Sequence, residues 1–292
     1  RLQALLTAEN YPEAIQLLLE GQQCISTYKQ FTSIRQLAVK LQDTLELTEE
    51  QLDVALSKVC VDFNQESYKK IIEAYGLLGT SKMHCSMNQL QMHFASAVHN
   101  TAWNKVYGHA VLSQQLSAPI TVTDTTDASF KGAGGGVQCS AEDLSKRLYG
   151  DICGKVASSS LLPCVLDLCR ALWGIMDSYK KVVEYHRAEN KAKASDIANM
   201  EKAYKHCNND DEEDTDKKNA DKMREEELIE TEETTLMRED IQKKLETGST
   251  RIWQDVQTKV GLLVVGSDVS ELTIDQFLKL LDVIDRLIEV GT

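Results

Sequence analysis

Histidine and cysteine are the residues of this chain that could supply metal ligands, nucleophiles or proton-transfer groups. The 292 residues include 6 histidines and 8 cysteines. The closest pairs are His84 with Cys85, His93 with His99, and Cys164 with Cys169. A zinc pair on one helix face is usually about four residues apart, and none of these pairs has that spacing. We therefore expect no metal site, and these small side chains are better explained as parts of a core.

Motifs for catalysis and nucleotide binding are also missing. The glycine-rich stretch 132–136 is not followed by the Lys-Ser or Lys-Thr of a phosphate-binding loop, and no apolar strand precedes it. The sequence contains no Gly-x-Ser-x-Gly elbow, no His-Glu-x-x-His helix and no kinase motif set. We expect no enzymatic activity and no cofactor, and an enzyme with an unrecognised site stays as a minor alternative.

The charge balance limits the classes of partner that the chain is expected to bind. The chain has 32 Lys and Arg against 45 Asp and Glu, for a net charge of −13. Such a chain offers no basic surface for nucleic-acid phosphates or for anionic lipids. The region 201–240 alone holds 16 acidic and 7 basic side chains, so most of the excess charge is local. The rest of the protein is close to balanced.

Cysteine usage and hydropathy indicate the compartment. The cysteines are scattered without a Cys-x-x-Cys pair, which favours free thiols in a reducing, cytoplasmic compartment. We find no run of about 20 apolar residues and expect no transmembrane segment. The opening residues resemble the end of an amphipathic helix rather than a signal peptide, so we expect an interior part of a longer protein.

Hydrophobic periodicity and the shortage of turn formers, with only 3 Pro and 15 Gly, predict an all-α fold. Asn10 and Asn64 are candidate helix caps, Gly79 is a candidate stop, and 273–276 matches a capping box. Short connections should make neighbouring helices antiparallel, as an elongated rod-like bundle interrupted by disordered loops. The expected helices are 10–28, 32–59, 64–78, 81–113, 141–156, 161–186 with a weaker continuation to 204, 231–260 and 273–290.

The same patterns divide the chain into five regions. The expected organisation is an N-terminal helical bundle (1–116), a flexible Thr/Gly-rich insert (117–140), a helical hairpin (141–204), an acidic disordered loop (205–230) and a C-terminal helical pair (231–292). The acidic run 210–214 cannot offset its ordering entropy by burial, which is why a loop is expected there.

One apolar stripe is long enough to be a seam for a partner helix. It consists of seven residues spaced three, four or seven apart: Ile34, Leu37, Leu41, Leu45, Leu52, Leu56 and Val59. Its alternative explanation is the core of the bundle to which the helix itself belongs, and the spacing alone does not separate the two.

Six blocks of sequence resemble a family of vesicle-tethering subunits. The blocks are 8–15 (AENYPEAI), 40–46 (KLQDTLE), 50–58 (EQLDVALSK), 97–101 (AVHNT), 167–173 (DLCRALW) and 250–257 (TRIWQDVQ). They are similar to the subunit specific to the endosome-associated recycling protein complex, a relative of subunits of the Golgi-associated retrograde protein complex. The resemblance extends along the whole chain, and the Thr/Gly-rich insert and the acidic loop depart from it.

The resemblance implies a non-enzymatic, helical-rod subunit of a tethering complex. Expected partners are the other subunits and SNARE proteins, with membrane association only through the complex. The expected location is cytoplasmic and peripheral, on recycling endosomes and the trans-Golgi network, in endocytic recycling and retrograde transport. The alternative function is a regulatory helical module that recruits a basic partner through the acidic loop.

Overall fold

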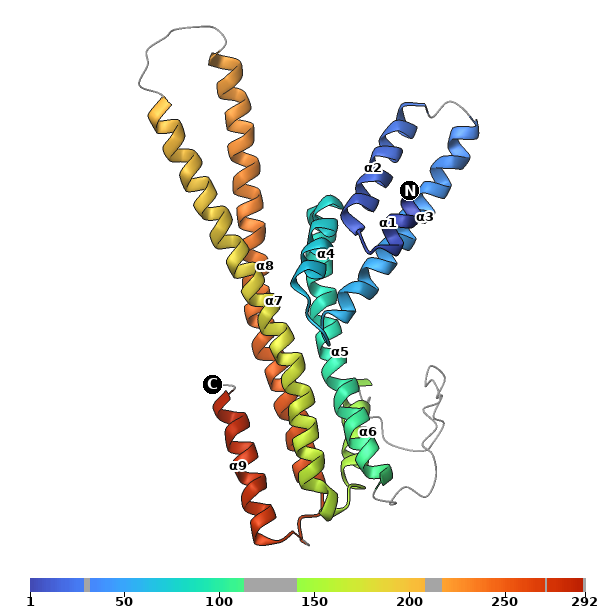
Figure 1. The fold of residues 1–292 in the computed structure, drawn as a ribbon, viewed down its shortest axis with the longest axis vertical. Helices are drawn as coiled ribbons and strands as arrows, with labels where there is room; N and C mark the ends of the chain where they lie inside the picture. Colours follow the sequence, from blue (N-terminus) through green and yellow to red (C-terminus); the bar gives the residue numbers. More distant parts are fainter. Residues whose placement is uncertain (29–31, 113–140, 208–216, 271, 291–292) are drawn as a thin grey trace, which may run out of the picture. The chain divides into compact units, whose positions relative to one another are not determined.

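The computed structural model describes residues 1–28, 32–112, 141–207, 217–270 and 272–290, and every regular element within them is an α-helix (Figure 1). The prediction of an all-α fold is confirmed. The helices are α1 Leu2–Thr7, α2 Tyr11–Thr27, α3 Thr32–Lys58, α4 Gln65–Leu77, α5 Thr80–Leu112, α6 Ala141–Cys153, α7 Ser158–Cys207, α8 Lys217–Gly266 and α9 Ile274–Val290.

Local signals explain several helix ends. The Asn64 side chain accepts a hydrogen bond from the Ser67 backbone N–H at 3.0 Å, so its predicted cap is confirmed. Gly79 has a φ of +98°, a conformation that suits glycine and follows the end of α4. Asn10 precedes α2 without a side-chain cap bond, so that predicted cap is wrong. Its φ of −92° and ψ of 70° differ from the extended backbone that a capping residue usually adopts.

Of the two interruptions predicted in the helical fold, only part of the acidic loop can be compared with the structure. The insert 117–140 and the acidic run 210–214 lie outside the described residues. The loop expected over 205–230 is too long, because α7 continues to Cys207 and α8 already begins at Lys217. Lysine and glutamate fill much of 217–230 and are good helix formers, so this charged stretch is helical without a predicted apolar face.

The described chain forms two compact units. Unit 1 consists of Arg1–Ala95 and Ile175–Arg251, and unit 2 consists of Ser96–Gly174 and Ile252–Thr292. The division falls inside α5, α7 and α8, so the predicted ranges 1–116, 141–204 and 231–292 each contribute to both units.

In unit 1, α5, α7 and α8 approach closely at Gly248. A Cβ atom at this glycine would collide with the Tyr179 hydroxyl and would lie 2.8 Å from Nε2 of Gln91. The Tyr179 hydroxyl donates to the Leu245 carbonyl at 2.7 Å, and the tyrosine ring meets Phe94 edge to face at 4.8 Å. Only glycine leaves room for this tyrosine between the helices.

A second polar contact in the core of unit 1 joins α4 to α7. The Tyr68 hydroxyl and Nε2 of His186 are 2.8 Å apart, and both side chains are buried. Burial lowers the pKa of His186 to about 4 and raises the pKa of Tyr68, so both side chains stay neutral at physiological pH. Their hydrogen bond satisfies polar groups that would be costly to bury alone.

In unit 2, a buried lysine links three helices. Lys259 of α8 donates to Nδ1 of His99 on α5 at 2.8 Å, and its Nζ lies 4.7 Å from the ring centre of Tyr149 on α6. The Tyr149 hydroxyl donates to the Lys259 carbonyl at 3.2 Å. Burial and the nearby Lys259 charge lower the pKa of His99, so a neutral imidazole accepts a hydrogen bond from the lysine amine.

Candidate partner-binding surfaces

The predicted seam on α3 is buried in its C-terminal half. Leu45, Leu52, Leu56 and Val59 have at most 7% of their surface exposed, and they form part of the core of unit 1. The spacing that predicts a seam here also produces a core-facing helix side. A partner helix could contact these four residues only if unit 1 opened.

The N-terminal half of the stripe is more accessible. Leu37 is 50% exposed, whereas Ile34 and Leu41 are half-buried. Leu41 lies against α2, because a Cβ atom at Gly21 would be 3.1 Å from its Cδ2 atom. Helices α2 and α3 lie side by side within unit 1 (Figure 1). The part of the predicted seam that a partner can reach is therefore the Ile34–Leu37 end.

The histidines connect helices instead of gathering as metal ligands. His93 on α5 contacts Asp53 on α3 at 3.0 Å in unit 1, and His109 contacts Asp167 at 3.1 Å in unit 2. His84 lies 3.6 Å from Asp240. Within the described residues, no three His, Cys, Asp or Glu side chains are grouped as a metal ion would require. Sequence reasoning missed these partners because 40 or more residues separate each pair along the chain.

Six cysteines of the described chain are free thiols: Cys24, Cys60, Cys85, Cys153, Cys164 and Cys169. Cys60, Cys153 and Cys164 are buried, whereas Cys24 and Cys85 are exposed. Burial raises the pKa of Cys60 and of Cys164 to about 12 and that of Cys153 to about 11. The reactive thiolate is therefore scarce at all three buried positions.

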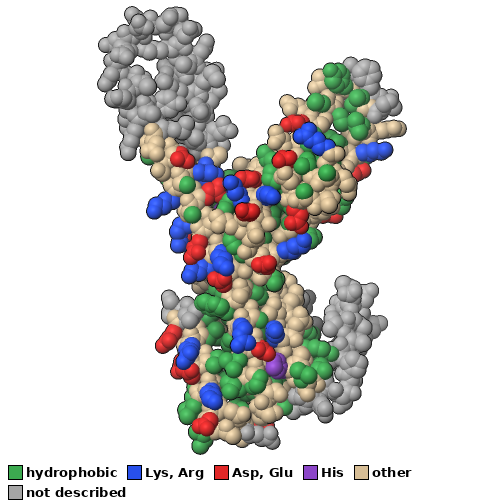
Figure 2. Space-filling model, in the orientation of Figure 1, with side chains coloured by type: hydrophobic (Ala, Val, Ile, Leu, Met, Phe, Trp, Pro, Cys, Tyr) green, Lys and Arg blue, Asp and Glu red, His purple; other side chains and the backbone are tan. Residues whose placement is uncertain are grey.

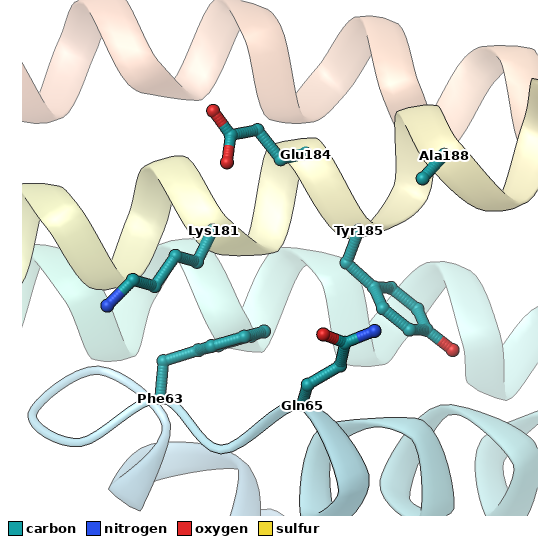
Figure 3. A pocket seen from close by; sticks show the side chains of 6 residues that line it. All are labelled: Phe63, Gln65, Lys181, Glu184, Tyr185 and Ala188. Atoms are coloured by element: carbon teal, nitrogen blue, oxygen red, sulfur yellow. The ribbon is translucent and has the colours of Figure 1, made fainter.

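A cavity of about 450 Å³ in unit 1 lies between α7 and the start of α4 (Figure 3). Phe63, Gln65 and Tyr185 line it together with Lys181, Glu184 and Ala188. The Lys181 amine and the Glu184 carboxylate point away from each other (Figure 3). Lys181 pairs with Asp177 at 2.7 Å, and Glu184 lies 3.9 Å from Lys180. The charged groups of this cavity thus do not converge as an acid and a base would.

A second cavity in unit 1, of about 610 Å³, lies among the α1–α2 turn, the end of α3 and α4. Its lining includes Tyr11, Val59, Val61 and Ile71, and the Lys58 amine lies 3.7 Å from the Glu9 carboxylate at the same cavity. Burial, followed by the Glu9 charge, raises the pKa of Tyr11. Both apolar and charged side chains therefore line this cavity.

Helix α7 contradicts the expectation that no segment of the chain is long and apolar enough to span a membrane. Its stretch Ser158–Asp196 is long and apolar enough to cross a membrane, by length and composition alone. Its buried residues recur at helical spacing, as at Leu161, Leu168, Ile175 and Val182, while the positions between them include exposed charges. This is the pattern of a helix packed along one side within a protein core.

One apolar surface was not singled out from the sequence. Helix α9 carries large apolar side chains at alternating steps of three and four residues, the spacing of a coiled-coil seam. We call this set the α9 seam: Ile274, Phe277, Leu281, Ile284 and Ile288. The spacing was visible in the sequence, but the exposure of the seam was not.

Comparison with known proteins adds the family. The family model described as vacuolar-sorting protein 54, of GARP complex, matches residues 1–185. The chain belongs to this family. The chain is also similar over its whole length to syndetin of Gallus gallus (38% identity) and of Rattus norvegicus and Mus musculus (40% each).

The family match has a defined extent. The chain spans about a quarter of the length of the syndetins it matches, from 25% to 26%. No solved structure gives a significant match. The resemblance to this tethering family that the sequence blocks predict is confirmed, and it includes both compact units.

Proposed function

We propose that this chain is a non-enzymatic helical scaffold within a multisubunit vesicle-tethering complex. The observation that carries the proposal is the family match over residues 1–185 together with the similarity to syndetin along the whole chain. The helical architecture supports it, because packed helices keep binding surfaces at defined positions.

The complex would serve endocytic recycling and endosome-to-Golgi retrograde transport. The protein would be cytoplasmic and peripheral, on recycling endosomes and the trans-Golgi network, and would reach the membrane through other subunits. Those subunits are its first expected partners, and SNARE proteins are the next. The net charge of −13 supports indirect membrane association, because anionic lipids would repel the chain as a whole.

On this chain, the contact with another subunit would use the accessible end of the α3 stripe. Ile34 and Leu37 lie on the side of α3 that is buried farther along the helix, so a partner helix could extend the same packing. The four buried members of the stripe would then hold α3 in place.

Copurification of the full-length protein with the other tethering subunits tests the proposal. The wild-type protein should copurify with the other subunits. Leu37→Asp should reduce their recovery several-fold, because the substitution places a charge in an apolar contact. Leu47→Asp is the matched control, since Leu47 is similarly exposed on α3 but lies outside the apolar stripe. Failure of the wild type to recover any subunit, with binding of a basic peptide at low salt instead, would favour the regulatory module.

A further inference from the structure

Helix α9 presents an open apolar side in unit 2. Ile274, Phe277, Leu281 and Ile288 expose between 42% and 78% of their surface, whereas Leu280 is buried and holds the helix to the rest of the unit. Leu278, beside the seam, is also exposed. Isolated exposed hydrophobic residues are common, but a row of them along one helix side marks an interaction surface.

The helix is held in shape by its own N-terminal signals. The Thr273 N–H donates to Oε1 of Gln276 at 3.1 Å, and the Gln276 N–H donates to Oγ1 of Thr273 at 3.3 Å. These reciprocal bonds are the capping box that the sequence predicts. The seam is therefore formed before any partner arrives, which lowers the ordering cost of binding.

Acidic side chains border the seam on one side. Asp285 directly follows a seam residue on the exposed side, and Asp275, Asp282 and Glu289 recur seven residues apart beyond it. The basic residues lie farther round the helix, where Arg286 pairs with Asp282 at 3.2 Å. Figure 2 shows hydrophobic, acidic and basic side chains together on the surface over α9, at the lower left of the view.

The heptad spacing and the acidic border identify the kind of occupant. A seam with steps of three and four residues fits the knobs of another helix with the same spacing. Charges that directly flank such a seam influence which helix binds it. On α9 this position is held by Asp285, whose carboxylate favours Lys or Arg on the incoming helix. An anionic membrane would meet the same carboxylates and be repelled.

We propose that the α9 seam docks an amphipathic helix of another protein subunit, whose own heptad seam is flanked by Lys or Arg. This inference deepens the proposed function and rests on it for the choice of a subunit as partner. It assigns the protein a second contact surface, in unit 2, besides the accessible end of the α3 stripe in unit 1.

Peptide binding to the full-length protein tests the chemistry of the surface. The probes are two designed helical peptides with the same Leu and Ile seam, one flanked by Lys and the other by Glu. The Lys peptide should bind roughly tenfold more tightly, and added salt should reduce the difference. Equal binding of the two peptides, or binding to phosphatidylserine vesicles in place of the Lys peptide, would overturn the proposal.

Substitutions on α9 test whether the Lys peptide binds at the α9 seam. Leu281→Asp should abolish Lys-peptide binding, and Asp285→Lys should weaken it several-fold while leaving the apolar seam intact. Glu50→Lys on α3 makes the same charge change at an exposed site elsewhere and should have no effect. A loss of equal size for Asp285→Lys and Glu50→Lys would mean general charge attraction and would refute the assignment to α9.

A photo-crosslinker in place of Leu278 in the assembled complex identifies the occupant. The expected product joins α9 to a helical segment of another subunit that has heptad spacing and basic flanks. Crosslinks to a second copy, to lipid or to this chain itself would overturn the inference. If the wild type recovers the complex while these products appear, the docking proposal alone fails; if it recovers no subunit, the proposed function fails.

Discussion

The two compact units differ in whether the apolar side of a helix is buried or exposed. Unit 1 buries Leu45, Leu52 and Leu56 of α3 in its core, whereas unit 2 leaves Phe277 and Leu281 of α9 exposed over 44% and 42% of their surface. Both stripes have helical spacing and consist of large apolar side chains. An apolar stripe thus becomes a core or a docking surface according to the helices packed against it, and its spacing does not separate the two outcomes.

The polar contacts of the two cores differ as well. Unit 1 holds His186 neutral beside Tyr68, while unit 2 buries the amine of Lys259 against His99 and the Tyr149 ring. Burial lowers the pKa of both histidines and of Lys259. Each unit thus contains a buried group whose charged form is destabilised, and each can be tested separately.

The largest contrast is expected from truncation of one leucine in each unit. Leu56→Ala removes a fully buried side chain from unit 1 and should lower the free energy of unfolding by about 2–5 kcal/mol. Leu281→Ala in unit 2 should cost less than about 1 kcal/mol, because much of this side chain is already in water. Urea denaturation followed by circular dichroism measures both. Equal losses would remove the contrast between the units.

A pair of glycines on α8 gives a second contrast. Gly248→Ala should destabilise unit 1 by about 1–3 kcal/mol, because the added methyl group displaces the Tyr179 hydroxyl. Gly261→Ala in unit 2 meets nothing within 4 Å and should stabilise the helix by up to about 1 kcal/mol. Thermal unfolding of the two variants compares them. A stable Gly248→Ala protein would mean that the helices are not packed closely there.

The buried histidine of unit 1 should make stability depend on pH. The His186 pKa is about 4 in the folded protein against 6.5 normally, so its contribution is complete above pH 6.5 and is lost as pH falls toward 4. The loss at pH 5 is about 2 kcal/mol. Denaturation at several pH values should show that His186→Gln flattens this slope and that His99→Gln in unit 2 flattens it less. An unchanged slope in His186→Gln would show that other groups cause it.

Removal of a helix cap gives the smallest effect. Thr273→Ala breaks the capping box of α9 and should cost about 1 kcal/mol, seen as faster amide hydrogen exchange in the first turn. Asn10→Ala at the start of α2 should change little, because its side chain makes no cap bond. A larger effect at Asn10 than at Thr273 would contradict the observed cap geometry.

Features that depend on near neighbours in the chain could be predicted. The helices follow from the spacing of apolar residues, and the Asn64 cap, the Gly79 stop and the capping box at Thr273 follow from residue types three or four positions apart. The contacts between helices could not be predicted in this way. Tyr68 and His186 are 118 residues apart, and no local pattern pairs them.

The accessible part of the partner-binding surface could not be predicted from the sequence either. The sequence identified an apolar stripe on α3 but not which part of it is accessible, and it left α9 as one more helix. Leu52 and Leu37 belong to one stripe, yet the first is fully buried and the second is half exposed. Only the position of neighbouring helices distinguishes them.

The amino-acid sequence alone is enough to predict the helical class, the charge that disfavours nucleic acid and anionic membranes, and the resemblance to a tethering family. These properties depend on composition, periodicity and short blocks of residues. The exposure of each apolar helix side depends on the tertiary structure. So do the contacts of the histidines with tyrosine, aspartate or lysine, and the place where a partner helix can dock. Burial is a property of the helices that surround a side chain, so it exists only once the chain has folded.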